Sequence, residues 1–299
     1  MKVSVVIRTL NEARHLPELL QAIKSQRYPD GEIETIVVDS GSTDGTIEIA
    51  GAAGAKIVHI HKENFSFGRS LNIGCGIATG YALVIVSGHC IPTNADWIAG
   101  LVAPLGKQGI VYSYGRQLGL NTTRFSECQI LAKYFPEESR IPQEGFFCNN
   151  ANSALLQQVW RNNRFDEELL GLEDMHLARR LVEQGNKIAY VADAAVYHFH
   201  DEVWEQVRHR FEREAIALQK IMPEIHITAL DVLRYVTSAV FMDCRFALRQ
   251  GRLGKVFGEV VRYRIAQFWG SYRGNHEYRE LSRKRKEDYF YPRQTRTKN

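Results

Sequence analysis

The 299-residue chain lacks several features that would place it in a particular class of protein. No apolar run approaches the ~20 residues that cross a membrane, and residues 1–12 become polar too soon for a signal peptide. The five cysteines are scattered without CxxC spacing, which argues against a disulfide framework or a zinc site. No internal repeat or long linker rich in Pro or Ser occurs. These absences predict a cytoplasmic protein with free thiols.

The chain has an ordinary globular composition with an uneven distribution of charge. Hydrophobic residues make up 44% and charged residues 24%, which is enough apolar material for a large core. The net charge is +4, but residues 1–200 carry −3 and residues 201–299 carry +7. A basic C-terminal end indicates an anionic neighbour, either membrane headgroups or nucleic acid. The alternative is a basic end that is merely solvated.

Strand-like and helix-like segments alternate through the first hundred residues. The predicted strands are 3–7, 33–38, 55–59 and 81–86, and the predicted helices are 16–25, 47–53 and 68–79. This alternation indicates an α/β fold with a parallel, doubly wound sheet, in which ligands bind beyond the carboxyl ends of the strands. Asp39 and the segment Ser87-Gly88-His89 lie at two such ends.

The pattern is less regular in the rest of the chain. Strands are predicted at 110–114, 146–152, 188–191 and 195–198, and helices at 166–184, 203–221, 230–248 and 253–269. Residues 283–299 have the composition of a disordered tail. The chain therefore divides into a sheet domain, 1–202, and a helical C-terminal extension with a basic tail, 203–299.

Two motifs stand near the N-terminus, "SVVIRTLNE" at 4–12 and "VVDSGSTDGT" at 37–46. Together they resemble the opening of family 2 glycosyltransferases, which have the GT-A fold. Arg8, Leu10 and Ser40 replace a Pro, a Tyr and an Asp of the family pattern. Three later segments are also similar to family motifs, in the right order: "FGRSLNIGCGIATG", "NNANSALLQQVWRNNRFDEELLGLEDMHLARRL" and "VYHFH". The resemblance covers about residues 1–200 and implies a mostly parallel central sheet flanked by helices.

The resemblance implies that a nucleoside-diphosphate sugar binds to the first half of the fold. Thr9, Glu12 and Asp39 would contact the base and ribose. Arg69 would lie near the diphosphate, where a planar cation suits paired phosphate oxygens. The alternatives are a surface Arg at a helix start and a Ser/Gly-rich loop that only caps a helix. The nucleotide-sugar-binding residues predicted are Thr9, Glu12, Asp39, Ser42, Arg69 and Ser87.

The fourth strand of this family normally ends in Asp-x-Asp, whose carboxylates hold a divalent metal. Here Ser87-Gly88-His89 takes that place, and a neutral imidazole can ligate Mn²⁺ or Mg²⁺ where Ser87 cannot supply a charge. We predict His89 and His198 as metal ligands, and strand alternation puts His200 on the same face as His198. The alternative is a site without metal, in which His89 only hydrogen-bonds phosphate.

The resemblance also implies inverting transfer, which needs a carboxylate to take the proton of the acceptor hydroxyl. Asp174 is the predicted general base. Glu173 points about 100° away on a helix, so it would orient the acceptor or a neighbouring Arg. The alternative for this pair is capping of the helix dipole. Asn149-Asn150 and Trp160 would line the acceptor pocket, although Trp160 fits core packing equally well.

Two further segments, "FSFGRSLNIG" and "SGHCIP", are similar to a rhamnosyltransferase-like subgroup that acts on surface polysaccharides. The donor implied is UDP- or dTDP-linked, with dTDP-rhamnose as one candidate, and the acceptor is a cell-surface polysaccharide or a lipid-linked glycan precursor. The alternative is a catalytically inactive sugar-nucleotide or glycan-binding module that lost its activity with Asp-x-Asp.

The C-terminal helices mix apolar residues with Arg, Lys and aromatic residues, which is typical of interfacial amphipathic helices. Lipid-linked acceptors would explain such helices, so we expect peripheral contact with the inner face of the cell membrane. The alternatives are packing on the catalytic domain and a dimer contact. No recognition motif supports binding of nucleic acid.

Overall fold

The computed structural model describes residues 1–29, 31–120, 122–276 and 289–290. Two compact units divide the chain, and each is described by itself. The sheet unit contains 1–123, 130–168 and 173–200, and the helical unit contains 124–129, 169–172 and the chain from 201 onward. Most of the tail predicted to be disordered, 283–299, lies outside the described residues.

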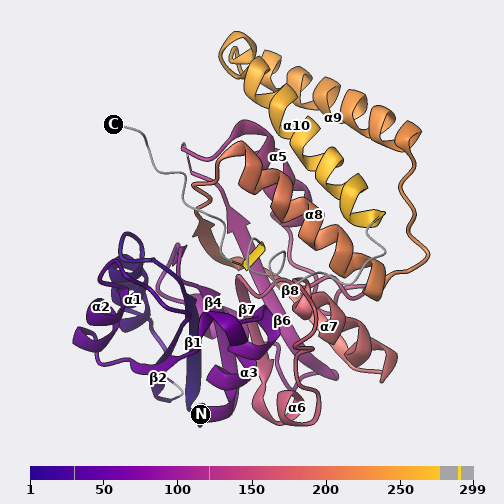
Figure 1. Cartoon of the computed structure of the whole chain (residues 1–299). Helices are drawn as coiled ribbons and strands as arrows, with labels where there is room; N and C mark the ends of the chain where they lie inside the picture. The colour runs from indigo at the N-terminus through magenta and orange to yellow at the C-terminus, as the bar shows by residue number, and fades with distance from the viewer. Residues whose placement is uncertain (30, 121, 277–288, 291–299) are drawn as a thin grey trace. The chain divides into compact units, whose positions relative to one another are not determined.

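The first half of the sheet has the predicted alternation of strands and helices (Figure 1). Its parallel strands follow the order β3-β2-β1-β4, so β1 lies between β2 and β4. The strands are β1 (Val3–Thr9), β2 (Ile33–Asp39), β3 (Lys56–His59) and β4 (Ala82–Ser87). The intervening helices are α1 (Leu16–Lys24), α2 (Thr46–Ala52), the 3₁₀ turn η1 (Lys62–Asn64) and α3 (Phe67–Ile77). The doubly wound prediction for this half is confirmed.

The second half of the sheet mixes directions and continues in the order β4-β7-β6-β8-β5. β7 is antiparallel to both of its neighbours, and β5 is antiparallel to β8. Four of the seven strand pairings in the sheet are parallel, as expected of a mostly parallel sheet. These strands are β5 (Cys90–Pro92), β6 (Ile110–Leu118), β7 (Asn152–Leu156) and β8 (Lys187–His198). The helices in this region are α4 (Trp97–Val102), α5 (Phe125–Tyr134), α6 (Gln157–Asn162) and α7 (Glu173–Glu183).

Two predicted starts of elements in this half are wrong, and a backbone hydrogen bond explains one while a left-handed residue explains the other. The predicted strand 146–152 starts only at Asn152, because the Asn150 N–H donates to the Asp174 carboxylate instead of joining a strand ladder. The predicted helix 166–184 starts only at Glu173, because Leu172 has φ +56°, which no α-helix accepts. The two short strands predicted at 188–191 and 195–198 form one strand, β8, with a register shift against β6.

Each face of the sheet contributes to its own hydrophobic cluster. Val5, Ile7 and Trp97 belong to one cluster, and Val6 and Trp160 belong to the other. Successive side chains of a strand point to opposite faces, so β1 is buried on both sides, as in a sheet covered by helices on each face. Trp160 is only 1% exposed and donates from Nε1 to Asn72 Oδ1, so it packs in the core and does not line an acceptor pocket.

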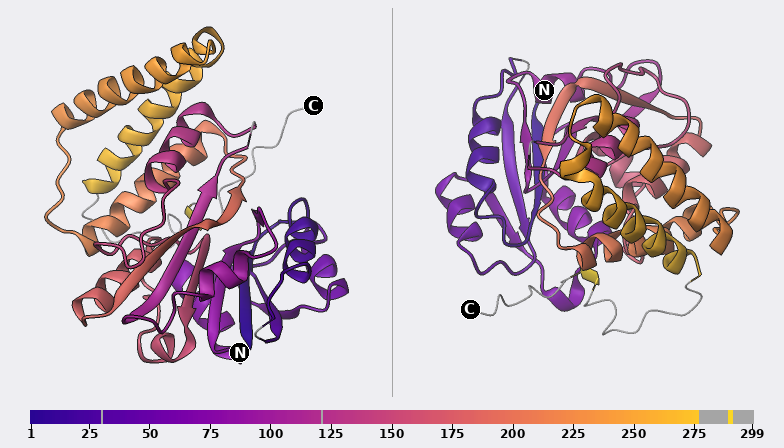
Figure 2. Two further views of the ribbon diagram at one scale, coloured as in Figure 1. Left: turned by 180° about the vertical axis from the view of Figure 1, so that it is seen from behind. Right: turned by 90° about the horizontal axis from the view of Figure 1, so that it is seen from above.

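The helical unit confirms the helices predicted after residue 203. They are α8 (Trp204–Ile221), α9 (Ala229–Arg249) and α10 (Leu253–Asn275), and α9 and α10 form a hairpin (Figure 2). A Cβ added at Gly270 would lie 2.3 Å from the Arg208 carbonyl oxygen, so this glycine lets α10 touch the backbone of α8. The Arg264 guanidinium donates to both oxygens of Asp243 at 2.8 Å, which joins α10 to α9. Among the described helices, none is both long and apolar enough to cross a membrane.

Close packing of α3 on the sheet yields a stability prediction. A Cβ at Gly74 would lie 2.6 Å from Val6 Cγ1 and 2.7 Å from Val38 Cγ2, and valines are too stiff to withdraw. We expect Gly74→Ala to destabilise the fold by about 1–3 kcal/mol through overpacking. Gly76→Ala, in the same helix, meets no atom closer than 3.9 Å and is expected to stabilise it by about 0.5–1 kcal/mol. Urea unfolding measures both, and equal effects of the two variants would contradict the packing described.

Candidate active site

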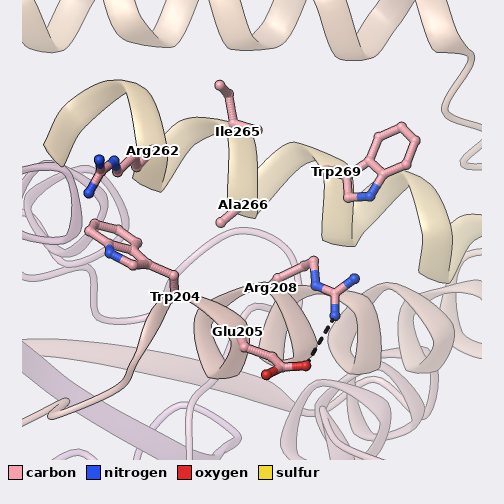
Figure 3. Close-up of a pocket in the computed structure, with 7 residues that line it drawn as sticks. All are labelled: Trp204, Glu205, Arg208, Arg262, Ile265, Ala266 and Trp269. Carbon is pink, nitrogen blue, oxygen red and sulfur yellow. Dashed lines mark ion pairs between the residues drawn. The ribbon is translucent and has the colours of Figure 1, made fainter. Parts of the chain in front are cut away.

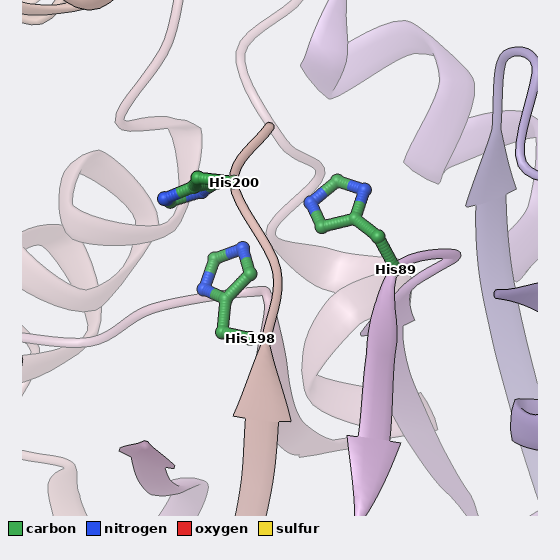
Figure 4. A group of neighbouring side chains, drawn as sticks. All are labelled: His89, His198 and His200. Atoms are coloured by element: carbon green, nitrogen blue, oxygen red, sulfur yellow. The ribbon is translucent and has the colours of Figure 1, made fainter. Parts of the chain in front are cut away.

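Three imidazoles gather beyond the carboxyl ends of β4 and β8 (Figure 4). The ring centroids of His89 and His198 lie 5.1 Å apart, and those of His198 and His200 lie 4.1 Å apart. One ligand nitrogen from each residue lies within 4.8 Å of the other two. The cause is strand pairing, since Cys90 of β5 lies opposite His198 of β8. The structure therefore brings together the two residues predicted to share a metal and adds His200 to them.

Hydrogen bonds on Nδ1 orient two of the three rings. His89 Nδ1 lies 2.6 Å from Glu12 Oε1, and His198 Nδ1 lies 2.6 Å from Gln117 Oε1. Gln117 donates from Nε2 to Asn149, so its Oε1 accepts and the proton of His198 is assigned to Nδ1. Histidines that ligate a metal commonly hold their other nitrogen in this way. The three residues therefore fit a divalent ion that accepts imidazole nitrogens.

Gly88 explains why the strand ends in Ser-Gly-His. A Cβ at this position would lie 2.9 Å from Glu12 Cγ and 3.1 Å from the Arg8 carbonyl oxygen. The Gly88 N–H donates to that same oxygen at 3.1 Å, so the chain runs directly beside β1. Ser87 lies opposite Arg8 at the end of β4. The small residue thus lets His89 reach Glu12, which was predicted only as a nucleotide contact.

Three of the residues predicted to bind nucleotide form one hydrogen-bonded unit after β2. Asp39 Oδ1 accepts from the backbone N–H groups of Gly41 and Ser42, both at 2.9 Å. Its Oδ2 accepts from Thr9 Oγ1 at 3.1 Å and from Ser42 Oγ at 2.5 Å. A carboxylate has about four lone-pair positions, and Asp39 is completely buried. Contact between Asp39 and a base stays a prediction, and it would require one of these bonds to be shared.

Arg69 lies in the first turn of α3. Its backbone N–H donates to the capping Ser66 Oγ at 3.1 Å, and its Nε lies 3.9 Å from a Glu167 carboxylate oxygen. The side chain is 48% exposed, and a surface ion pair at this distance contributes little to stability. Its predicted contact with the diphosphate stays a prediction.

Two adjacent carboxylates open α7 and are both buried. Glu173 Oε1 accepts from Arg8 Nη1 at 3.2 Å, and the Arg8 guanidinium also lies 4.9 Å from the Phe67 ring. Asp174 Oδ2 accepts from the Asn150 N–H at 2.7 Å. Burial, and then the charge of Glu173, raise the pKa of Asp174 to about 7. A carboxylate that only caps a helix dipole normally stays in water, so the burial of this pair indicates more than capping.

Sequence patterns missed Arg8 and Gln117 as site residues. Arg8 was visible as a charged residue inside the otherwise apolar run of β1, at a position where the family pattern has Pro. Gln117 lies in β6 and is 2% exposed, and no sequence motif marks it. It connects His198 to Asn149 Oδ1, which also accepts from the Ala151 N–H. The loop 149–151 therefore contacts both the histidine side of the site, through Gln117, and Asp174.

This fold and the site at the carboxyl edge of the sheet define the GT-A class of glycosyltransferases. A solved structure of the mannosyltransferase PcManGT from Pyrobaculum calidifontis, in complex with GDP-Man and Mn²⁺, is similar over 93% of this chain and 88% of its own. The TM-score is 0.64 and the sequence identity 18%, so this likeness concerns the fold.

The glycosyl transferase family 2 profile matches residues 4–160, which is more than half of the chain, so the protein belongs to this family. The O-antigen chain rhamnosyltransferase RfbN of Salmonella typhimurium is 28% identical over 214 residues, 67% of each chain. The glycosyltransferase AglE of Haloferax volcanii is 33% identical over 210 residues, 66% of each chain. The chain is thus a glycosyltransferase, as its sequence motifs predicted.

Proposed function

We propose that this protein transfers a sugar, with inversion, from a nucleoside-diphosphate sugar to a hydroxyl of a cell-surface polysaccharide or lipid-linked glycan precursor. The observation that carries the proposal is the buried Asp174, whose pKa is raised to about 7 at the carboxyl edge of a GT-A sheet. A general base works best when its pKa lies near the working pH. Such a carboxyl can take the acceptor proton at neutral pH.

The residues around Asp174 support this assignment. The Asn150 N–H fixes one carboxylate oxygen at 2.7 Å, so the group has a defined direction. Arg8 is paired with Glu173 at 3.2 Å, which gives the adjacent carboxylate a cationic partner and leaves Asp174 as the proton acceptor. Direct attack by an acceptor activated in this way inverts the anomeric centre. A catalytically inactive binding module would have no use for a buried, costly carboxylate pair.

A divalent metal is part of the proposal. His89, His198 and His200 would hold it, and when bound it would neutralise charge on the leaving diphosphate. Imidazole nitrogens suit transition ions, whereas Mg²⁺ prefers oxygen ligands, so Mn²⁺ fits these residues better than Mg²⁺. The Mn²⁺ in the PcManGT structure supports this choice.

The donor is proposed to be a UDP- or dTDP-linked sugar, with dTDP-rhamnose as the first to test. The name of the relative RfbN, an O-antigen chain rhamnosyltransferase, supports rhamnose and a surface polysaccharide. Thr9, Glu12, Asp39 and Ser42 form or adjoin the loop that would receive the nucleotide, and Arg69 would approach its diphosphate.

Replacing the proposed base tests the mechanism. Asp174→Asn is expected to lower the transfer rate by about 10²–10⁴-fold, because the amide cannot accept a proton. The wild-type rate should rise with pH through about 7 and then level off, since the carboxyl must be ionised and its pKa is raised. Release of nucleoside diphosphate and product formation with dTDP-rhamnose and UDP-sugars measure both.

Glu183→Gln, at the exposed end of α7, is the matched control and should leave the rate unchanged. The pKa of the Asp174 carboxyl is higher in the folded protein than in the unfolded chain. Ionisation of this carboxyl therefore lowers the free energy of unfolding at any pH above its unfolded pKa. The neutral Asn is therefore expected to leave the protein folded at pH 8, as circular dichroism would show. A folded Asp174→Asn variant with normal turnover would refute the assignment.

Removing the hydrogen bond that His198 donates to Gln117 tests whether His198 is a metal ligand. Gln117→Leu removes the oxygen that accepts from Nδ1, and we expect Mn²⁺ affinity to fall by about 10–100-fold. Gln117→Glu keeps an acceptor there and should recover much of the affinity. The paramagnetic resonance signal of free Mn²⁺ measures binding without any turnover. Gln143→Leu, away from these histidines, is the control for loss of a hydrogen-bonded, half-buried glutamine. Unchanged Mn²⁺ affinity in Gln117→Leu would argue against His198 as a ligand.

We further propose that α9 contacts an anionic membrane surface. Leu230, Phe241 and Leu248 are 78%, 70% and 65% exposed, and their spacing of 11 and 7 residues places them along one side of the helix. Arg245 and Arg249 are exposed on the same helix. Apolar side chains that insert between lipids, next to guanidinium groups that meet acidic headgroups, are typical of helices that lie on membranes.

Vesicle sedimentation tests this contact. Phe241→Ser should weaken binding to vesicles of phosphatidylglycerol and phosphatidylethanolamine about tenfold, because one large apolar side chain no longer enters the bilayer. Ile77→Ser removes a comparable side chain, 40% exposed at the end of α3, and should have no effect. Wild-type protein that dimerises through this face and ignores vesicles would contradict membrane contact.

A further inference from the structure

A cavity of about 520 Å³ lies between α8 and α10 of the helical unit (Figure 3). This size is within the usual range for pockets that bind small molecules. The lining residues come from one turn at the start of α8 and two turns in the middle of α10. They are Trp204, Glu205, Arg208, Arg262, Ile265, Ala266 and Trp269.

The position of the cavity follows from the packing of the two helices. Gly270 and Gly274 let α10 touch the backbone of α8, at the Arg208 and Glu212 carbonyl oxygens. The cavity begins directly beyond this contact, toward the N-terminal ends of both helices. Ile265 and Trp269 remain 50% and 48% exposed there. Large apolar side chains left in water beside an open cavity indicate a surface that gains stability when it is covered.

The lining combines carbon surfaces with an excess of positive charge. Two indole rings, an isoleucine and an alanine offer apolar contact, whereas the polar side chains are two guanidinium groups and one carboxylate. The carboxylate of Glu205 lies 3.7 Å from Arg208 and 3.5 Å from His209, so it is already engaged. Within the described part of the chain, no carboxylate lies within ion-pair distance of Arg262. The cavity therefore suits a ligand that is apolar at one end and anionic at the other.

We propose that this cavity binds a lipid phosphate, with the hydrocarbon chain against Trp204, Ala266 and Trp269 and the phosphate against Arg262 and Arg208. Guanidinium groups pair with phosphate oxygens through parallel N–H donors. The proposal rests on the proposed function, because a lipid-linked acceptor carries this chemistry. A glycan would need both neutral donors and neutral acceptors, and the neutral polar groups among the lining side chains are two indole N–H donors without a neutral acceptor.

The four tryptophans of the chain make the binding measurable. Trp97 and Trp160 are at most 1% exposed in the sheet unit, whereas Trp204 and Trp269 line the cavity. Dodecyl phosphate is added in increasing amounts to the full-length protein without donor. The change in tryptophan fluorescence should reach a plateau as the site fills. Inorganic phosphate and the uncharged dodecyl maltoside should bind far more weakly, because each offers only half of the required chemistry. The double variant Trp204→Phe/Trp269→Phe should lose the signal.

Two variants separate a built site from general charge attraction. Arg262→Gln should weaken dodecyl phosphate binding about tenfold, through loss of a charge-assisted pair. Lys255→Gln removes the same charge from an exposed position of α10 that does not line the cavity, and it should leave the affinity unchanged. Equal losses in the two variants would overturn the proposal, as would saturable binding of UDP or of a soluble oligosaccharide in place of dodecyl phosphate.

Donor turnover and lipid binding are measured separately, so each can be lost without the other. Release of nucleoside diphosphate from the donor, with water as the acceptor, should be the same in wild type and in Arg262→Gln. Transfer to a lipid-linked acceptor should fall in Arg262→Gln. A wild type that turns over the donor but never binds dodecyl phosphate would reject the lipid site alone.

Discussion

The reversal of the chain after β4 is the constraint on which the rest of the candidate site depends. Gly88 runs directly beside β1, where a Cβ would meet Glu12 and the Arg8 carbonyl oxygen. β5 then pairs antiparallel with β8, which puts Cys90 opposite His198 and sets the ring of His89 5.1 Å from the ring of His198. One small residue and one strand pairing thus bring together imidazoles that are more than a hundred positions apart in the sequence.

The second constraint is electrostatic. Glu173 and Asp174 are both removed from water, and Arg8 pairs directly only with Glu173. Burying a carboxylate is costly, and a second negative charge beside it adds to the cost. The protein relieves the cost by letting Asp174 hold its proton more tightly, which raises its pKa to about 7. Of these two carboxyl groups, Asp174 is therefore the one suited to exchange a proton near neutral pH.

The sequence alone predicts the strands and helices of 1–87 closely, because short aliphatic runs alternate there with helical spacing and the turns carry Gly, Ser and Asp. Prediction from the sequence fails where a local contact or backbone angle interrupts a regular strand or helix. Asn150 directs its N–H to a carboxylate, and Leu172 adopts a left-handed backbone, so neither the strand at 146–152 nor the helix start at 166 forms. Both failures lie beside the site, where local rules are most often overridden.

The same distinction holds for the site residues. The family resemblance predicted roles for His89, His198 and Asp174, because each stands in a recognisable motif at a strand end or a helix start. Gln117 and Arg8 were missed because their roles depend on which residues the sheet places opposite them, and register between distant strands cannot be read from a single sequence. A charged residue in an otherwise apolar run, such as Arg8, is the one kind of signal that would have pointed to such a role.

Exchange of carboxylates for imidazoles also changes the charge that a donor would meet. A site built on two carboxylates is anionic until a cation fills it, so it repels a diphosphate on its own. Ser87 and neutral imidazoles carry no such charge, and Glu12 is engaged by His89 at 2.6 Å. The repulsion that the proposed cation would have to overcome is therefore smaller here, and its main contribution would be to neutralise charge on the leaving group. It follows that donor binding should depend less on metal than the chemical step does.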